Sequence, residues 1–172
     1  MKYDPQKHHR HSIRLDGYDY SQAGAYFVTI CAHQREELFG QVESGIMHLN
    51  GFGKIVQSAW TDLPHHYPLV EIEPYCVMSN HIHGVVVLPP EPPDTEVRQP
   101  LSEIVRAFKS FSAARINQIR NAKGRPVWQR NYYEHIIRST AEWQKIADYI
   151  HANPQRWAAD HLHPANPAPP GS

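Results

Sequence analysis

The sequence has little cysteine, no long apolar run and no excess of charge of either sign. Its two cysteines, Cys31 and Cys76, both fall in segments of strand-like composition and provide no disulfide framework. No apolar run approaches the length of a membrane span, and the opening Met-Lys-Tyr-Asp is unlike a signal peptide. These absences argue against a disulfide-rich secreted domain and a membrane protein, and we expect a cytoplasmic protein in a reducing compartment.

The balance of charge argues against a protein that is held to nucleic acid by net charge alone. The 17 lysines and arginines match the 17 aspartates and glutamates, so the formal net charge is zero. The distribution is uneven, because residues 98–130 contain many basic residues and a single acid, Glu103. The basic residues are Arg98, Arg106, Lys109, Arg115, Arg120, Lys123, Arg125 and Arg130. They indicate a phosphate-binding face, although a solvated helix surface would have the same composition.

The length of 172 residues predicts one domain with a sizeable core. Residues 1–14 are basic and lack apolar periodicity, so we expect a mobile arm there. Residues 15–157 contain the periodic segments and form the expected domain. Residues 158–172 are rich in proline, alanine and histidine, and we expect them to be disordered.

Strand-like and helical segments alternate along the expected domain. Apolar and β-branched runs predict strands at residues 25–33, 70–77, 81–89 and 127–138. Apolar residues at helical spacing predict helices at residues 51–66, 101–119 and 140–152. A short hairpin is expected near residues 42–49, and the proline-rich residues 89–100 are expected to form a loop.

The resulting order, β-α-β-β-α-β followed by a helix, is that of the α+β ferredoxin-like fold with an added C-terminal helix. In this fold, strands one and three are central in an antiparallel sheet, and both connecting helices cover one face. We therefore expect residues 81–89 to form a central strand, with His81 and His83 on the open face of the sheet.

The segment His81-Ile82-His83 is a candidate metal site. Side chains two residues apart on a strand point to the same face, with Cα atoms roughly 6.5 Å apart. Two imidazoles held in this way can bind one metal ion, while Ile82 points into the core. The alternative is a pair of partly buried structural histidines, and the spacing alone does not separate the two interpretations.

The last predicted helix carries further candidates. Tyr149 and Asn153 are four residues apart and share one helical face. An amide oxygen suits a hard cation such as Mg²⁺ or Mn²⁺. A tyrosine beside that cation could attack a phosphate, although Tyr149 could equally be an amphipathic residue at the edge of a helix interface. Tyr132 and Tyr133 are rival nucleophiles, of which at most one should join the site because neighbouring strand residues face opposite sides.

Several segments together resemble a known family. Asn80-His81-Ile82-His83 resembles the HUH motif (His, hydrophobic residue, His) of single-tyrosine transposases, in particular the REP-associated tyrosine transposases. Residues 24–29, 127–138 and 148–154 resemble further blocks of that family. The resemblance extends over residues 10–157, with the blocks in the expected order and spacing.

The resemblance implies a role for each candidate. His81 and His83 would bind a divalent metal, Mg²⁺ or Mn²⁺, and Tyr149 would form a 5′-phosphotyrosine link with single-stranded DNA. Asn153 lies where relatives have a polar third ligand, with His151 as a competitor for that role. The implied substrate is single-stranded DNA with hairpins, cleaved and rejoined without nucleotide triphosphates.

Other side chains are candidate DNA contacts. The candidates for phosphates are Arg106, Lys109, Arg115 and Arg130, and those for stacking on unpaired bases are Trp128, Tyr132 and Tyr133. The same aromatic residues could instead fill the packing of the fourth strand. Two other functions stay open: a nickase of the relaxase or replication-initiator type, and a domesticated protein that binds hairpins without cutting. The sequence does not distinguish a monomer from a homodimer.

Overall fold

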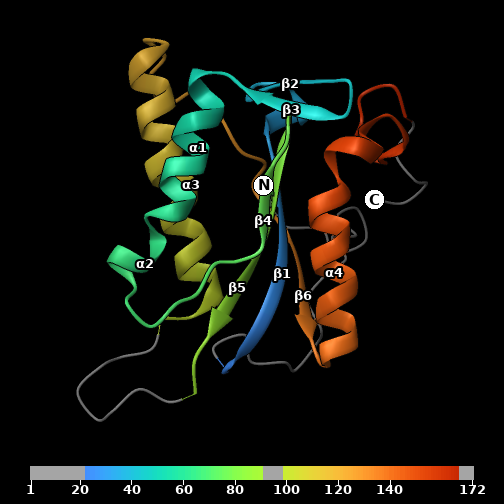
Figure 1. The fold of residues 1–172 in the computed structure, drawn as a ribbon. Coiled ribbons are helices and arrows are strands. Elements are labelled where there is room, and N and C mark those ends of the chain that lie inside the picture. Colours follow the sequence, from blue (N-terminus) through green and yellow to red (C-terminus); the bar gives the residue numbers. More distant parts are fainter. Residues whose placement is uncertain (1–21, 91–98, 167–172) are drawn as a thin grey trace, which may run out of the picture.

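A computed structural model describes residues 22–90 and 99–166 of the chain. The predicted arm at residues 1–14, most of the proline-rich loop and residues 167–172 lie outside this part. Among the described residues, an antiparallel sheet has the strand order β4-β5-β1-β6 (Figure 1). Its strands are β1 Gly24–Cys31, β4 Tyr75–Val77, β5 His81–Leu88 and β6 Tyr133–Ile137. The central strands are thus the first and third of the β-α-β-β-α-β motif, as the ferredoxin-like prediction requires.

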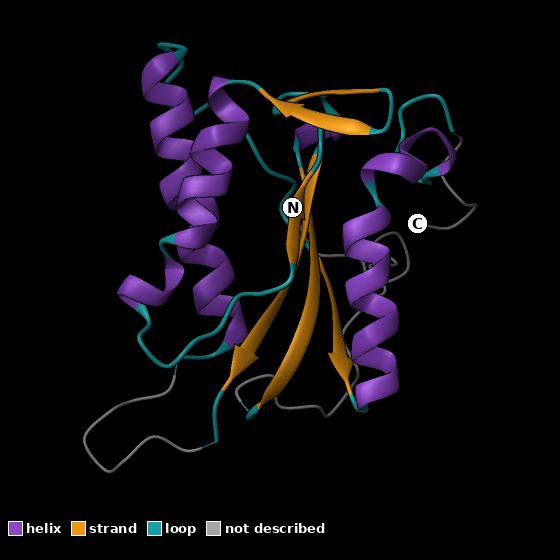
Figure 2. Cartoon of the chain, viewed as in Figure 1, coloured by secondary structure: helices purple, strands orange, loops and turns teal. Residues whose placement is uncertain are grey.

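Helices cover both faces of this sheet (Figures 1 and 2). The helices are α1 Gly51–Thr61, α2 Leu63–His66, α3 Leu101–Ile119 and α4 Thr140–Ala152. Helices α1 and α3 pack against each other on one face, and α4 lies alone on the other. The ferredoxin-like fold with an added C-terminal helix is therefore confirmed. None of the helices in residues 22–90 and 99–166 combines the length and the apolar character needed to cross a membrane.

The pairing of β1 with β5 fixes which side chains meet α4. Eight residue pairs run from Gly24 opposite Leu88 to Cys31 opposite His81. Val28 and Val86 face the larger core under α1 and α3, whereas Phe27 and Val85 pack with Ile150 of α4. Because both faces are covered, these strands are apolar almost throughout rather than alternating.

Several element boundaries differ from the predictions, and prolines explain two of them. The predicted helix over residues 51–66 divides at Asp62 into α1 and α2, because Pro64 cannot donate a helical hydrogen bond. In the predicted strand over residues 70–77, regular pairing as β4 begins only at Tyr75 and Glu71 forms an isolated bridge to Val87, since Pro74 between them cannot donate a hydrogen bond. The short hairpin is confirmed as β2 Gly40–Glu43 paired with β3 Ile46–Leu49.

The predicted strand over residues 127–138 is wrong in its first half. Only Trp128 forms a bridge, to Ala32, and β6 begins at Tyr133. Lys109 of α3 donates hydrogen bonds to the carbonyls of Gln129 and Arg130, at 2.6 and 2.9 Å, which bind this segment to the helix. The chain therefore crosses the end of the sheet before it joins the edge as β6.

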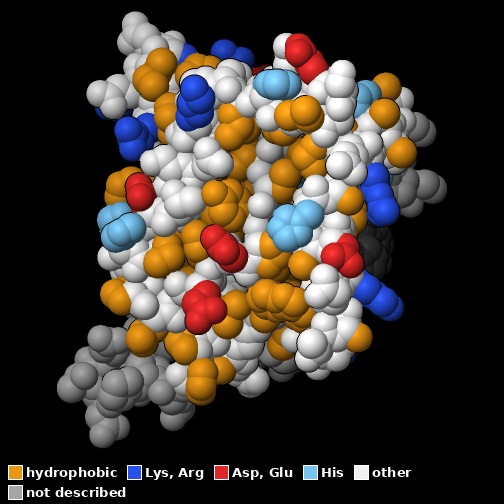
Figure 3. All heavy atoms as spheres, viewed as in Figure 1, with side chains coloured by type: hydrophobic (Ala, Val, Ile, Leu, Met, Phe, Trp, Pro, Cys, Tyr) orange, Lys and Arg blue, Asp and Glu red, His pale blue; other side chains and the backbone are white. Residues whose placement is uncertain are grey.

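The end of the described chain is also ordered, contrary to the predicted disorder from residue 158. A 3-10 helix, Pro154–Ala159, follows α4, and turns continue to residue 166. Trp157 and Leu162 are buried and pack with Met78. Burial of these apolar side chains therefore helps to hold residues 157–162 in place, together with hydrogen bonds such as that from the Leu162 N–H to Asp160 Oδ1 at 2.7 Å. On the face viewed in Figure 3, hydrophobic side chains gather between the two helix layers, over the edge of the sheet.

Candidate active site

Strand β5 holds His81 and His83 on the face that α4 covers. The two rings lie side by side, with their centroids 4.3 Å apart. Both side chains are buried, at 0% and 1% exposure, so the face expected to be open is closed by the added helix. Ile82 between them points into the opposite core. The alternation of the strand therefore brings both imidazoles to the same site.

Neighbouring oxygens determine which nitrogen of His81 is free. Asn80 donates its side-chain amide hydrogens to the carbonyls of Leu162 and Arg35, so its Oδ1 is left as the acceptor. That oxygen lies 2.8 Å from His81 Nδ1, which must therefore carry the proton. Nε2 of His81 then has a free lone pair, which is the form of the ring that binds a metal.

His83 is held in a similar way. Its Nδ1 lies 2.8 Å from the hydroxyl of Thr29 on β1, which leaves Nε2 directed toward α4. Burial lowers the pKa of His83 well below its ordinary value, and His81 lowers it further. Burial likewise lowers the pKa of His81 to about 3; His161 adds to this effect and Asn153 opposes it in part. Both rings are therefore neutral near pH 7, as a metal ligand must be.

Helix α4 brings Tyr149 to the histidine pair. The helix begins after Ser139, whose hydroxyl accepts a hydrogen bond from the backbone of Glu142, and Ile150 anchors it on the sheet. The Tyr149 hydroxyl lies 3.3 Å from His83 Nε2, and its ring meets Phe27 edge-on. Burial raises the pKa of the Tyr149 phenol to about 12, and Asp160 adds to this rise.

Asn153, one turn after Tyr149, lies at the same site. Its Oδ1 and the Nε2 of His81 are both buried, and neither has a hydrogen-bond partner of normal geometry among the described residues. Burying such atoms without partners is costly, so their presence beside His83 fits a cation that takes His81, His83 and Asn153 as ligands. Nitrogen and amide oxygen ligands suit a small divalent ion. The described residues contain no group of three or more His, Cys, Asp and Glu side chains that could hold a metal, so a third protein ligand beside the two histidines would have to be of another kind, such as the Asn153 amide.

His151, the competitor for the third position, lies elsewhere. It is exposed on α4 and lines a different cavity, beside Trp143 and Tyr75 of the sheet edge. Residues one helical turn apart point the same way, whereas His151 is only two residues from Tyr149. The side chains of His151 and Tyr149 therefore point to different sides of α4. The structure thus places Asn153, and not His151, with the histidine pair.

Asp160 belongs to the site and was missed in the sequence. Its Oδ2 accepts a hydrogen bond from Asn153 Nδ2 at 2.9 Å and lies 3.4 Å from the Tyr149 hydroxyl. The residue falls in the segment expected to be disordered because of its composition. The signal that could have indicated order is the pair of large apolar residues on either side of it, Trp157 and Leu162.

A cavity of about 420 Å³ opens over His83 and Tyr149. Tyr132 and Tyr133 both line it, which corrects the expectation that at most one of them could join the site. Tyr132 precedes β6 and therefore lies outside the alternation of that strand. Arg130 is exposed in the same segment. Two of the predicted base-stacking residues thus line the same cavity as the candidate nucleophile.

Trp128, by contrast, is a core residue. Its ring packs against Phe39 and Phe108, and its Nε1 donates a hydrogen bond to the buried Ser112 hydroxyl at 2.9 Å. In this arrangement it presents no face to a base. The alternative interpretation of strand packing therefore applies to Trp128.

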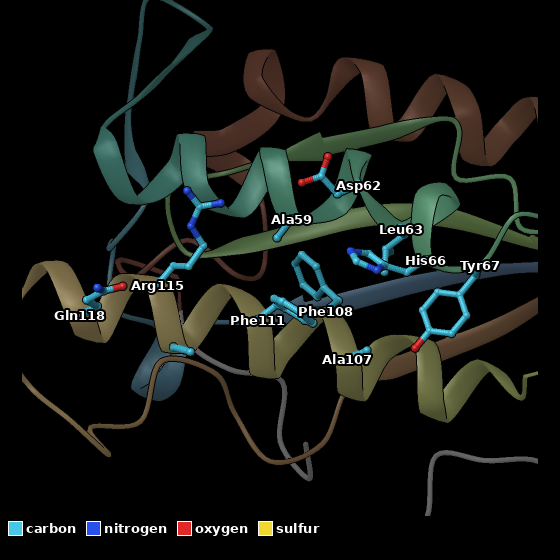
Figure 4. A pocket seen from close by; sticks show the side chains of 11 residues that line it. Ala59, Asp62, Leu63, His66, Tyr67, Ala107, Phe108, Phe111, Arg115 and Gln118 are labelled. Carbon is cyan, nitrogen blue, oxygen red and sulfur yellow. The ribbon is translucent and has the colours of Figure 1, made fainter.

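The basic residues predicted on α3 lie across the sheet from the histidine pair. Arg106 pairs with Glu103 on the same helix, and Lys109 binds backbone carbonyls as described above. Arg115 lines a second cavity, of about 460 Å³, between α3 and helices α1 and α2. Figure 4 shows the Arg115 side chain extending from α3 toward α1, with Phe111 beside it. The structure does not bring these three residues to the cavity at Tyr149.

Comparison with known proteins agrees with the resemblance seen in the sequence. Residues 54–153 match a family described as "Transposase IS200 like". An uncharacterized protein of Haemophilus influenzae Rd is 37% identical over 94% of this chain and 97% of its own length. A second protein of that organism, named "Putative REP-associated tyrosine transposase", is 25% identical over 79% of this chain and 73% of its own length.

A solved structure of a REP-associated tyrosine transposase, bound to a REP hairpin, has a similar fold. It superposes with a TM-score of 0.60 at 22% identity and covers 84% of this chain and 73% of the other. At this identity the likeness is evidence for the fold. The family match spans more than half of the chain and the first relative exceeds 30% identity over almost all of it, so the chain belongs to the IS200-like transposases and is a homologue of the REP-associated tyrosine transposases.

Proposed function

We propose that this chain is a metal-dependent DNA strand transferase that cleaves and rejoins single-stranded, hairpin-bearing DNA through a 5′-phosphotyrosine intermediate. The observation that carries the proposal is the meeting of Tyr149 with His83, at 3.3 Å, beside two buried atoms that lack hydrogen-bond partners. Transposase-type function follows from the family; the chemistry at Tyr149 is the proposal.

His81, His83 and Asn153 would hold the cation, Mg²⁺ or Mn²⁺. IS200-like transposases are generally metal-dependent. When bound, such an ion supplies positive charge that polarises a phosphate for attack. The chain itself keeps both imidazoles neutral by burial, and Asn80 and Thr29 engage their Nδ1 atoms, which leaves both Nε2 atoms for the cation.

Tyr149 would be the nucleophile. Its hydroxyl oxygen forms a bond to phosphorus, and the bond from phosphorus to the 3′ oxygen of the preceding nucleotide breaks. The phenol loses its proton, and the leaving oxygen gains one and becomes a 3′ hydroxyl. Rejoining reverses these steps with a second 3′ hydroxyl, so the bond energy is conserved and no nucleotide triphosphate is needed. Burial raises the phenol pKa to about 12, so Tyr149 is neutral near pH 7 in the free chain and must lose its proton during the attack.

The cavity supports a single-stranded substrate. Tyr132 and Tyr133 line it beside Tyr149, and tyrosine rings are suited to stacking on unpaired bases. A related fold has been solved with a REP hairpin bound, which supports hairpin-bearing DNA as the substrate class. A domesticated protein that binds the same hairpins without cutting them is the alternative, and it differs in one measurable respect, the covalent adduct.

The test is incubation of the protein with an end-labelled hairpin oligonucleotide that has single-stranded flanks, in the presence of Mn²⁺. We expect a covalent protein–DNA adduct that survives denaturing electrophoresis. The adduct should be absent in Tyr149→Phe and in the double variant His81→Ala/His83→Ala. The matched controls are Tyr132→Phe and Tyr133→Phe, which remove one hydroxyl each from the same cavity and should retain the adduct.

Two results would contradict the proposal. If the adduct persisted in Tyr149→Phe and disappeared in Tyr132→Phe, the assignment of Tyr149 as the nucleophile would be wrong. If the unchanged chain bound the hairpin but formed no adduct at any Mn²⁺ concentration, the non-cutting alternative would hold.

A further inference from the structure

The carboxylate of Asp160 has no part in the reaction proposed above, yet it contacts two members of the site. It is 8% exposed, and its Oδ2 lies 2.9 Å from Asn153 Nδ2 and 3.4 Å from the Tyr149 hydroxyl. Its Oδ1 accepts a hydrogen bond from the backbone N–H of Leu162 at 2.7 Å and lies 3.5 Å from His161 Nδ1. This carboxylate is therefore fixed at both oxygens.

The contact with Asp160 determines which end of the Asn153 amide faces the histidines. An amide side chain can rotate by half a turn and exchange its oxygen with its NH₂ group at almost no cost in shape. An ionised carboxylate only accepts hydrogen bonds, so Asp160 selects the orientation in which Nδ2 points toward it. Asn153 Oδ1 is then the end left without a partner, buried at the site with His81 Nε2.

The same short segment also reaches the support of His81. The Leu162 carbonyl accepts a hydrogen bond from Asn80 Nδ2 at 2.9 Å. That bond leaves Asn80 Oδ1 to accept from His81 Nδ1 at 2.8 Å. Residues 160–162 thus support two of the three candidate ligands: the Asp160 side chain contacts Asn153, and the Leu162 carbonyl supports His81 through Asn80.

We propose that residues 160–162 are a positioning segment for the metal site, in which Asp160 orients the Asn153 oxygen and the Leu162 carbonyl, through Asn80, orients His81. The inference rests on the proposed function, because it requires that a cation bind at His81, His83 and Asn153. Partners of this kind, one step removed from the metal, typically change its affinity 10- to 100-fold when they are altered.

The test is the affinity of the full chain for Mn²⁺, measured by calorimetric titration without DNA. Asp160→Asn keeps the shape and retains an oxygen for the Leu162 N–H, but it presents NH₂ to Asn153. The Asn153 amide should then turn its own NH₂ toward the histidines, and we expect Mn²⁺ affinity to fall by roughly 10- to 100-fold. The matched control is Asp148→Asn, which makes the same change at an exposed position of α4 and should leave the affinity within about twofold.

A double-mutant cycle separates orientation from simple loss of negative charge. In an Asn153→Ala background there is no amide to orient, so Asp160→Asn should have little further effect on Mn²⁺ affinity. An equal loss in both backgrounds would mean that Asp160 acts through its charge, and the positioning role would be wrong. Thermal unfolding of each variant, followed without metal, establishes that the chain is folded.

The support of His81 through Asn80 is tested independently of Asp160. Asn80→Ala removes the acceptor of the His81 Nδ1 proton and should lower Mn²⁺ affinity to a similar degree. Unchanged affinity in both Asp160→Asn and Asn80→Ala would overturn the inference while leaving the metal site in place. Failure of the unchanged chain to bind Mn²⁺, or equal binding by His81→Ala/His83→Ala, would instead overturn the metal dependence proposed above and this inference with it.

Discussion

Ser112 is a buried hydroxyl in the middle of α3 that joins the helix to the segment leading into β6. Its Oγ donates a hydrogen bond to the Phe108 carbonyl at 2.7 Å and accepts one from Trp128 Nε1 at 2.9 Å. The indole N–H is only a donor, so it needs an acceptor once it is buried. The serine is therefore a specific hydrogen-bond partner of Trp128 and not a filler of space.

We expect Ser112→Ala to lower the free energy of unfolding by about 1–3 kcal/mol, because it leaves the Trp128 N–H buried without an acceptor. Urea denaturation measures this loss. Ser110→Ala is the matched control, since it removes the same hydroxyl from an exposed position of the same helix and should change stability by less than about 0.5 kcal/mol. Equal effects of the two substitutions would contradict the assigned role of the hydrogen bond.

Some residues of the site could be predicted from local spacing, and others depend on contacts that no local pattern encodes. The pairing of His81 with His83 follows from strand alternation, and that of Tyr149 with Asn153 follows from one helical turn. The burial of Trp128 depends on Phe39 and Ser112, which are remote in the chain. Asp160 was missed because the composition around it resembles a disordered tail, although Trp157 and Leu162 anchor that segment.

At the level of elements, β5 serves both layers of the molecule at once. His81, His83 and Val85 face α4, whereas Ile82 and Val86 face the core under α1 and α3. Between the latter two lies Gly84, over which the Trp60 ring of α1 packs directly. Trp60 is itself held by a hydrogen bond from its Nε1 to the Ile72 carbonyl at 3.2 Å. A glycine is thus needed at this position for α1 to approach the strand.

We expect Gly84→Ala to destabilise the fold by about 1–3 kcal/mol, because the added Cβ would overlap the Trp60 ring, which cannot move freely. Thermal or chemical unfolding detects this. Gly51→Ala, at the exposed start of α1, has no atom within 4 Å of the added Cβ and should leave stability unchanged or slightly higher. A loss in Gly51→Ala as large as in Gly84→Ala would show that the contact with Trp60 is not the cause.

The sequence predicted the elements better than their ends. Apolar periodicity identified each main helix and strand of the described residues, since periodicity reflects which faces are buried. Pro64 and Pro74 shortened their elements by removing backbone donors, and Lys109 of α3 engages the carbonyls of residues 129 and 130, which therefore do not continue the β6 ladder. Only the last of these effects is a tertiary contact, and it was the source of the largest error, in the predicted strand over residues 127–138.

For the molecule as a whole, the two faces of the sheet have different tasks. One face buries the larger core under α1 and α3, and the other carries the candidate site under α4. Thr29, His83 and Tyr149 come from β1, β5 and α4 of one chain, so the candidate nucleophile and the histidine pair meet within a single subunit. In this arrangement, the two polar imidazole rings of His81 and His83 are buried between the sheet and α4.

This burial links stability to pH. Burial lowers the pKa of His81 from 6.5 to about 3, and it lowers that of His83 well below 6.5. In the unfolded chain both rings take up protons as the pH falls through their ordinary pKa, whereas in the folded chain they remain neutral. The unfolded state therefore binds more protons between pH 6.5 and about 3, and lowering the pH in this range favours unfolding. The contribution is fully retained above the unfolded pKa.

We therefore expect the free energy of unfolding, measured by urea denaturation in the presence of a chelator, to decrease as the pH falls from 7 to 4.5. Each buried imidazole contributes a slope that approaches about 1.4 kcal/mol per pH unit once the pH is well below its ordinary pKa. Carboxylates with lowered pKa, such as Glu142, add to the total, so the informative quantity is the difference between variants. The slope should be shallower in His81→Gln/His83→Gln, whereas His48→Gln/His65→Gln, which replaces two exposed histidines, should keep the slope of the unchanged chain. If the variant of the buried pair kept the full slope, the two rings would not be held neutral by the fold as the pH falls below their ordinary pKa.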